Sequence, residues 1–171
     1  LAKQMQITLR TATINDLALL RHWDEQPHVK ASDGDEDWNW EYELQRFPEW
    51  REQLIAELDS RPIGWIQIIN PAEEESHYWG DVEAKLRAID IWIGEAEDLS
   101  KGYGTIMMNL ALERCFENEK VTAILIDPLE TNHGAIRFYE RIGFQFVERR
   151  TFEDSECMVY KMSREDWMKG V

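Results

Sequence analysis

Four segments between positions 89 and 142 decide the fold: IDIWIG at 89–94, LSKGYGT at 99–105, ILIDP at 124–128 and NHGAIRFYERI at 132–142. The first and third are short, apolar and rich in Ile, which is typical of strands in the middle of a sheet. The second carries two glycines ahead of a periodic apolar pattern and predicts a turn that opens a helix. The fourth has helical spacing and ends before a glycine. Together they predict a strand–helix–strand crossover followed by a second helix.

The sequence before this centre predicts a strand, two helices and a loop. Alternation of apolar and polar residues indicates an opening strand at 6–10. Thr13 and Asp16 resemble a capping box for a helix over 14–23. A loop is expected over 26–37, where proline, glycine and acidic residues gather, and a helical face over 38–47.

The remaining elements follow from the same patterns. Strands are expected at 54–58, 63–69, 86–94, 121–126, 144–149 and 157–162. The segment 54–58 also fits the end of a helix that begins at Glu49. Ser163 can cap a last short helix. This order indicates an α+β chain with a mixed, mostly antiparallel sheet of about six to seven strands flanked by helices, and the length favours a single domain over 1–171.

The net charge limits the classes of binding partner that this chain can have. The chain has 19 basic and 34 acidic residues, a net charge of −15. Nucleic acid is a poor partner, because binding it requires phosphate neutralisation by Lys and Arg. Such acidity serves solubility alone or attracts a cationic substrate into a cleft. Two isolated cysteines, Cys115 and Cys157, support neither a disulfide framework nor a metal site. Without a signal pattern or a long apolar run, we expect a cytoplasmic protein that does not span a membrane.

The turn at 100–105 predicts a phosphate site. Its glycines let the backbone approach a ligand closely, and the helix that follows presents N–H groups and partial positive charge. It is neither a Walker loop nor a dinucleotide fingerprint, because the required further glycines are missing. A plain turn is the alternative.

Two acidic features point to an amine. Asp90 lies between Ile89 and Ile91 in a predicted strand, where a carboxylate is costly to bury unless it is paired or placed at an opening. The segment 70–85 combines three successive glutamates with Tyr78 and Trp79. It is either a solvated loop or one wall of a substrate cleft, with acids for ammonium groups and rings for cation–π contact.

The pattern Asn132-x-x-Ala135-x-x-Phe138-Tyr139-x-x-x-Gly143-Phe144, downstream of the glycine turn, resembles the GCN5-related N-acetyltransferases, the GNAT superfamily. The resemblance implies acetyl-CoA as co-substrate and no metal, with the pyrophosphate on the glycine turn and the tyrosine beside the thioester sulfur. Where the family usually has Arg or Gln before the turn, this chain has Leu99. The cofactor-binding residues implied are Ile91, Trp92, Ile93, Ser100, Lys101, Gly102, Tyr103, Gly104, Thr105, Asn132, Ala135 and Phe138.

Within that superfamily the chain is similar to the aminoglycoside 6′-N-acetyltransferases, which confer antibiotic resistance. The similarity rests on 89–90, 99–105, 127–128, 132–137 and 139–140, with a loose counterpart of their early aromatic region at 31–40. It implies that Asp90 and Asp127 face the aminoglycoside. The substrate-binding residues expected are Glu74, Glu75, Tyr78, Trp79, Asp90 and Asp127.

The chemistry of acetyl transfer suits these residues. Asp90 can bind an ammonium and take its proton, directly or through water, and Tyr139 can protonate the departing thiolate. A backbone N–H near Trp92 can polarise the carbonyl. Direct transfer in a ternary complex is favoured, since neither cysteine has a base nearby in sequence.

Other interpretations stay open. Asp90 can be a paired structural carboxylate, Tyr139 a core aromatic and Asp127 a turn cap. The acceptor can instead be a polyamine, a siderophore hydroxylamine or a protein N-terminus. The chain can also be a non-catalytic acyl-CoA-binding module, and it can be a monomer or a homodimer.

Overall fold

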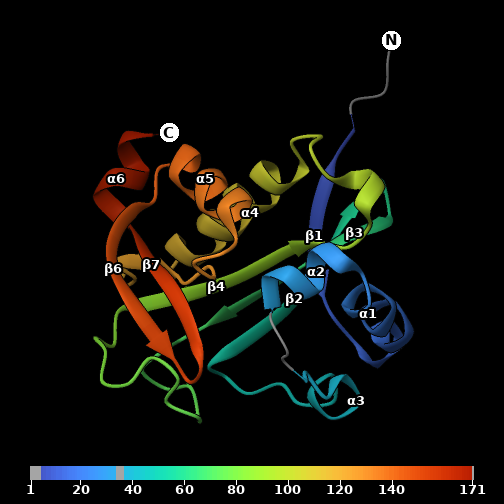
Figure 1. Cartoon of the computed structure of the whole chain (residues 1–171), viewed down its shortest axis with the longest axis horizontal. Coiled ribbons are helices and arrows are strands. Elements are labelled where there is room, and N and C mark those ends of the chain that lie inside the picture. The colour runs from blue at the N-terminus through green and yellow to red at the C-terminus, as the bar shows by residue number, and fades with distance from the viewer. Residues whose placement is uncertain (1–4, 34–36, 171) are drawn as a thin grey trace. The chain divides into compact units, whose positions relative to one another are not determined.

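The computed structural model describes residues 5–33 and 37–170, and its strands form one seven-stranded sheet in the order β1-β2-β3-β4-β5-β7-β6 (Figure 1). The strands are β1 Ile7–Thr11, β2 Arg51–Leu58, β3 Arg61–Ile69, β4 Leu86–Ile93, β5 Ala123–Ile126, β6 Gln145–Phe152 and β7 Ser155–Ser163. The helices are α1 Leu17–Asp24, α2 Pro27–Asp33, α3 Trp40–Glu43, α4 Tyr103–Phe116, α5 His133–Ile142 and α6 Arg164–Lys169, with short 3-10 turns at Ile14–Asp16 and Ala96–Asp98.

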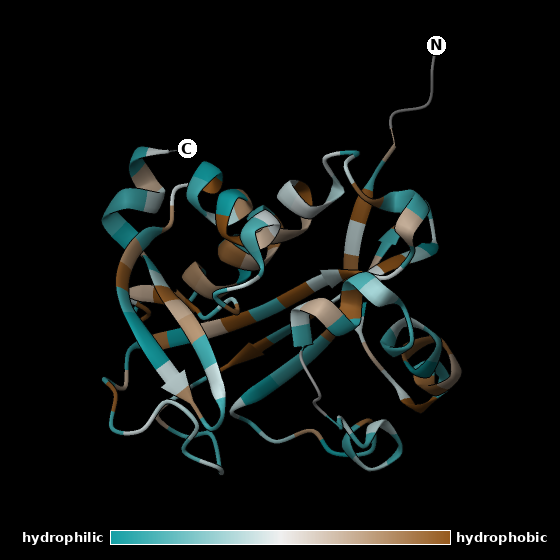
Figure 2. Ribbon diagram, in the orientation of Figure 1, coloured by the Kyte–Doolittle hydropathy of each residue, from teal (hydrophilic) through white to brown (hydrophobic). Residues whose placement is uncertain are grey.

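The sheet is mixed and mostly antiparallel, which confirms the predicted fold class. β1 pairs antiparallel with β2, and β7 pairs antiparallel with both β5 and β6. β4 and β5 are parallel, as the strand–helix–strand crossover through α4 requires. Figure 2 shows that hydrophobic and polar bands alternate along β4.

The chain divides into two compact units, each described by itself. The N-terminal unit comprises Leu1–Gln67 and Ile91–Leu110, and the C-terminal unit comprises Ile68–Asp90 and Ala111–Val171.

A tryptophan cluster forms the core of the N-terminal unit. Trp65 is fully buried and lies 5.0 Å from both Trp38 and Trp92 and 5.6 Å from Trp40, measured between ring centroids. Trp23 meets Trp92 edge-on at 5.5 Å. Large aromatic side chains bury much apolar area, so this cluster fixes α1, α3, β3 and β4 against one another.

Local signals set several element boundaries as the sequence predicts. The Thr13 and Asp16 side chains form the reciprocal capping box before α1. Ser163 accepts a hydrogen bond from the Asp166 N–H at the start of α6. Gly143 ends α5 with a φ of 120°, a conformation that favours glycine. The segment 51–58 is a strand throughout, so the helical alternative for it is wrong.

The expected loop over 26–37 is wrong for its first part, because Pro27–Asp33 forms α2. Proline is favoured at the first position of a helix, where its missing N–H is not needed, and buried Val29 anchors this one. Residues 34–36, which contain Gly34, lie outside the described residues. The helical face expected over 38–47 is also shorter than predicted, since α3 covers only Trp40–Glu43.

Candidate functional site

Two aspartates lie just beyond the end of the parallel β4–β5 ladder. The register of this ladder pairs Leu86 with Ala123 and ends at the pair Ala88–Leu125. Asp90 and Asp127 each follow two residues after that last pair. Because side chains alternate faces along a strand, both aspartates continue on the face of Ala88 and Leu125. Both are half-buried, so the C-terminal unit presents two carboxylates at one level of the sheet.

Tyr78 connects the 70–85 loop to these aspartates. Its hydroxyl donates a hydrogen bond of 2.5 Å to Oδ2 of Asp127. Burial raises the pKa of the Tyr78 hydroxyl, and the negative charge of Asp127 raises it further, with a smaller contribution from Asp90. Tyr78 is therefore a neutral donor at working pH. Two of the expected substrate-binding residues, Tyr78 and Asp127, are thus in direct contact.

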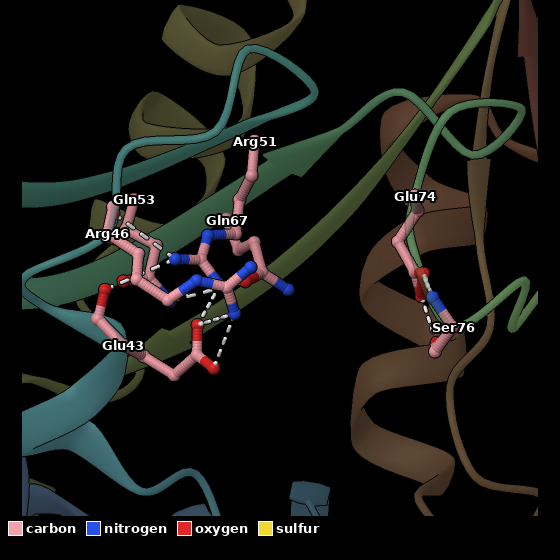
Figure 3. A network of polar contacts seen from close by, with 7 residues as sticks. All are labelled: Glu43, Arg46, Arg51, Gln53, Gln67, Glu74 and Ser76. Atoms are coloured by element: carbon pink, nitrogen blue, oxygen red, sulfur yellow. Dashed lines mark hydrogen bonds and ion pairs between the residues drawn. The ribbon is translucent and has the colours of Figure 1, made fainter.

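The two glutamates expected to bind substrate differ in their surroundings. Glu74 is buried, and its carboxylate accepts hydrogen bonds from the backbone N–H and the hydroxyl of Ser76 (Figure 3). It also accepts one from the N–H of His77. This carboxylate holds the turn of its own loop. Glu75 is exposed. A substrate role for either one stays a prediction.

The rings of the loop pack on a residue that the sequence patterns did not single out, Phe152 at the end of β6. Tyr78 stacks on Phe152 with centroids 4.5 Å apart and an interplanar angle of 8°, and Trp79 meets it edge-on at 5.0 Å. The Arg150 guanidinium lies 4.6 Å from the Phe152 centroid and donates to the Trp79 carbonyl at 3.1 Å. Only the cluster of aromatic and cationic residues at 150–152 could have pointed to this contact from sequence.

Tyr139 lies near the C-terminal end of α5, where backbone hydrogen bonds close the helix. Its carbonyl accepts hydrogen bonds from the N–H groups of Gly143 and Phe144, which close the end of the helix. Its side chain is buried, with ring contacts to Phe138 and Phe144. At the other end of α5, Oδ1 of Asn132 caps the helix by accepting from the Ala135 N–H at 3.2 Å. The helix therefore holds its predicted cofactor residues rigidly.

The glycine turn of the N-terminal unit has the geometry of an anion cradle. Ser100 and Gly102 have positive φ values of 60° and 83°, and both are exposed. A Cβ on Gly102 would meet no atom within 4 Å, so the space beside the turn is open. The first N–H groups of α4 have no partner inside the helix, because each helix leaves its first turn of donors unbonded. These features fit the pyrophosphate of coenzyme A.

The second half of β4 carries the other predicted cofactor contacts. Trp92 is buried, while Ile91 and Ile93 are half-buried. The Ile93 carbonyl accepts a hydrogen bond of 2.8 Å from His28 Nε2, so that oxygen is already engaged. Within the described residues, the indole N–H groups of Trp65 and Trp92 are buried and have no hydrogen-bond acceptor.

A cavity of about 160 Å³ also lies in the N-terminal unit. Its lining residues are Thr11, Ala12, Glu43, Leu44, Arg46, Phe47, Arg51, Glu52 and Gln53. Figure 3 shows Glu43 between the guanidinium groups of Arg46 and Arg51, which both donate to its carboxylate. In this network the charge of Glu43 is paired with arginines of the protein itself. The sequence did not predict a functional site here. Over residues 5–33 and 37–170 there is no cluster of side chains able to hold a metal ion, and no described helix is long and apolar enough to cross a membrane.

The comparisons with known proteins agree on one family. A family model described as an acetyltransferase (GNAT) domain matches residues 13–152. The aminoglycoside N(6′)-acetyltransferase type 1 of Klebsiella pneumoniae is 29% identical over 173 residues, which cover 93% of this chain and 84% of that relative.

Two solved structures of an aminoglycoside acetyltransferase, AAC(6′)-Ib, superpose on this chain with a TM-score of 0.85 at 28% identity. One is a complex with coenzyme A and the other a complex with coenzyme A and kanamycin. In both comparisons the match covers 96% of this chain and 98% of the solved chain.

Proposed function

The chain belongs to the GNAT acetyltransferase family and is an acetyl-CoA-dependent N-acetyltransferase, and from this premise we propose that it acetylates the 6′-amine of an aminoglycoside. The observation that carries the proposal is the pair of carboxylates, Asp90 and Asp127, at one level beyond the β4–β5 ladder. An aminoglycoside carries several ammonium groups on linked rings. Two carboxylates at a fixed separation suit such a polycation better than a single amine. The relatives' names and the kanamycin complex support the same acceptor.

In this proposal the neutral Tyr78 hydroxyl keeps Asp127 oriented without cancelling its charge. The hydrogen bond to Asp127 uses one oxygen, Oδ2, and an ionised carboxylate has further acceptor positions on both oxygens. Asp127 can therefore accept an ammonium N–H while it is held in place. The rings of Tyr78 and Trp79 add flat surfaces against which a sugar ring can pack.

Acetyl-CoA supplies the thioester whose acetyl group moves to the amine. Asp90 accepts a proton from the 6′-ammonium, directly or through water, so that the neutral nitrogen can attack the carbonyl carbon. A backbone N–H near Trp92 stabilises the charge that develops on the carbonyl oxygen. Tyr139 donates its hydroxyl proton to the sulfur as the carbon–sulfur bond breaks. Transfer is direct, with both substrates bound together.

The test is steady-state release of the CoA thiol with kanamycin and tobramycin as acceptors. We expect turnover with both, intersecting initial-rate patterns, and a product whose amide lies on the 6′-nitrogen in NMR spectra. Turnover of spermidine or an alkyl hydroxylamine with no turnover of any aminoglycoside would assign the fold to another acceptor. Absence of a thermal shift with acetyl-CoA would contradict the catalytic assignment itself.

A further inference from the structure

The loop of residues 70–85 carries four of the predicted substrate contacts, Glu74, Glu75, Tyr78 and Trp79. It contains no helix or strand, and His77 and Gly80 take left-handed φ values of 54° and 69°. Figure 1 shows it beside the tip of the β6–β7 hairpin. Its side-chain hydrogen bond to Asp127 places a hydroxyl within 2.5 Å of the carboxylate, so a small shift of the loop would break it.

Two contacts of the Arg150 side chain join this loop to the hairpin, one with the Trp79 carbonyl and one with Gly80. The Arg150 guanidinium donates to the Trp79 carbonyl at 3.1 Å and lies over the Phe152 ring on which Tyr78 stacks. It also lies against Gly80, where an ideal Cβ would be 3.4 Å from Nη2 of Arg150. Among the described residues, no carboxylate forms an ion pair with the Arg150 guanidinium.

The other wall of the site is fixed by the same stretch of hairpin. Arg150 lies opposite Cys157 in the β6–β7 register. Cys157 also forms an isolated bridge with Leu129, and the Met158 N–H donates to the Pro128 carbonyl at 2.9 Å. The backbone beside Asp127 is thereby attached to β7, and the loop is attached to β6 directly opposite.

The geometry points to Arg150 as a positioning residue, which clasps the 70–85 loop to the hairpin so that Tyr78 reaches Asp127. The effect of this contact on catalysis rests on the proposed function, whereas the contact itself does not. A guanidinium repels a cationic acceptor, so recognition cannot be the reason for placing one beside this site. Its contacts with a carbonyl oxygen and an aromatic face are those of a clasp.

The experiment compares the wild type with Arg150→Gln, Arg150→Lys and the control Arg21→Gln. The Arg21→Gln substitution removes the same charge from an exposed ion pair between Arg21 on α1 and Glu41 on α3. We expect Arg150→Gln to lower kcat/KM for kanamycin about tenfold, while the KM for acetyl-CoA changes less than about twofold. Arg150→Lys should recover part of the loss, and the control should match the wild type.

A double-mutant cycle with Tyr78→Phe separates positioning from charge. If Arg150 acts through Tyr78, Arg150→Gln should have little further effect on kcat/KM once the hydroxyl is gone. Additive losses, or a lower KM for kanamycin in Arg150→Gln, would overturn the inference, because removing a mere repulsive charge would improve binding of the cation.

Hydrogen exchange provides a readout that does not need an active enzyme. In Arg150→Gln the amides of the 70–85 loop should exchange faster than in the wild type, with the amides of α4 unchanged as the internal reference. Unchanged exchange in the loop would refute the clasp even if the protein acetylates aminoglycosides. Faster exchange in a protein that does not turn over aminoglycosides would retain the clasp and reject the proposed acceptor.

Discussion

Carboxylates in the two units accept hydrogen bonds from different partners. In the N-terminal unit, Asp16 receives two hydrogen bonds from Arg10, at 2.9 and 2.8 Å, and Asp98 receives two from Arg61, at 2.9 and 3.0 Å. In the C-terminal unit, Asp127 accepts a hydrogen bond from the neutral hydroxyl of Tyr78. In the same unit, the Arg150 guanidinium faces a carbonyl and an aromatic ring.

From this difference we propose which acids serve the fold and which serve a ligand. A fork of two hydrogen bonds from arginine fixes a carboxylate and also neutralises it. A phenol fixes a carboxylate and leaves its charge available to a cation. With 34 acidic residues, acidity by itself identifies no site in this chain. We propose that the identity of the donor, together with the position at the end of the β4–β5 ladder, distinguishes the acids that bind a ligand.

The largest effect is expected for Asp90→Asn. The substitution keeps the shape of the side chain and removes the base, so kcat should fall by roughly a hundredfold to a thousandfold. Acetyl-CoA should bind as in the wild type, and the melting temperature should stay within about 2 °C. Steady-state kinetics and a thermal shift titration with acetyl-CoA measure the two halves of this expectation.

The distinction between structural and ligand-binding carboxylates fails if Asp90→Asn affects stability rather than kcat, as is expected for Asp16→Asn. A large loss of stability with kcat retained would place Asp90 among the structural carboxylates and move the base to water or to another side chain. A loss of acetyl-CoA binding would instead place it on the cofactor side.

Tyr139→Phe should have the next largest effect. It removes a hydroxyl and leaves the ring contacts with Phe138 and Phe144, so the helix should keep its place. We expect kcat to fall about tenfold to a hundredfold with little change in the KM of the acceptor, because the proton is needed only as the thiolate leaves. Tyr78→Phe serves as the contrast, since it should raise the acceptor KM more than it lowers kcat. Equal effects of the two substitutions would show that the two hydroxyls do not have separate roles.

Asp16→Asn tests the structural half of the comparison. Loss of the charged pair with Arg10 should cost about 1–2 kcal/mol of unfolding free energy at pH 7 and lower the melting temperature by about 3–6 °C, with kcat unchanged.

The pH dependence of this loss has a definite sign. Burial disfavours the charge on Asp16, yet hydrogen bonds from Arg10 and the Thr13 N–H hold its pKa below the ordinary value. Its stabilising contribution is therefore present above the unfolded pKa, near 4, and is lost as the pH falls through the lower folded pKa. The difference in stability between the two proteins should shrink in that range. A constant difference down to pH 2 would contradict the ion-pair explanation.

Sequence patterns predicted what is local in this fold. The capping box at Thr13 and Asp16, the cap at Ser163 and the end of α5 at Gly143 each depend on residues within one turn of chain. The assignment of α2 failed because proline and nearby acids are loop signals as well as features of a helix start.

The contacts that shape the site are not local. Arg150 and Trp79 are 71 positions apart, and Tyr78 and Asp127 are 49 apart. No spacing rule connects such residues, since their meeting depends on strand register. Resemblance to a family named Asp90, Asp127 and Tyr139, and the acidic, aromatic composition of 70–85 named Tyr78. The contact of Arg150 with the loop became visible only in the structure. The expectations of a single domain, a cytoplasmic location and a monomer or homodimer stay predictions.

The smallest effect is expected for Asp24→Asn, which tests the boundary of the comparison. Asp24 lies in the N-terminal unit but accepts its hydrogen bond from a neutral donor, the Trp40 indole. Burial raises its pKa, and neighbouring Glu25 and Asp37 raise it further against that hydrogen bond. It also occupies the last position of α1, where a negative charge opposes the helix dipole.

The sign of the effect follows from linkage. A folded pKa above the unfolded value makes the contribution of Asp24 favourable below about pH 4 and unfavourable once the pH passes the folded pKa. Asparagine keeps an acceptor for Trp40 without the charge, so Asp24→Asn should raise the melting temperature at pH 7 by about 1–2 °C, and less at pH 4. Unfolding scans across this pH range measure it, with kanamycin kinetics alongside. If Asp24→Asn is stabilised and its KM for kanamycin is unchanged, Asp24 does not bind the acceptor. A hydrogen bond from a neutral donor would then indicate a ligand-binding acid only at the end of the β4–β5 ladder. A raised KM without stabilisation would mean that Asp24 belongs with Asp127, and that acceptor recognition extends into the tryptophan cluster.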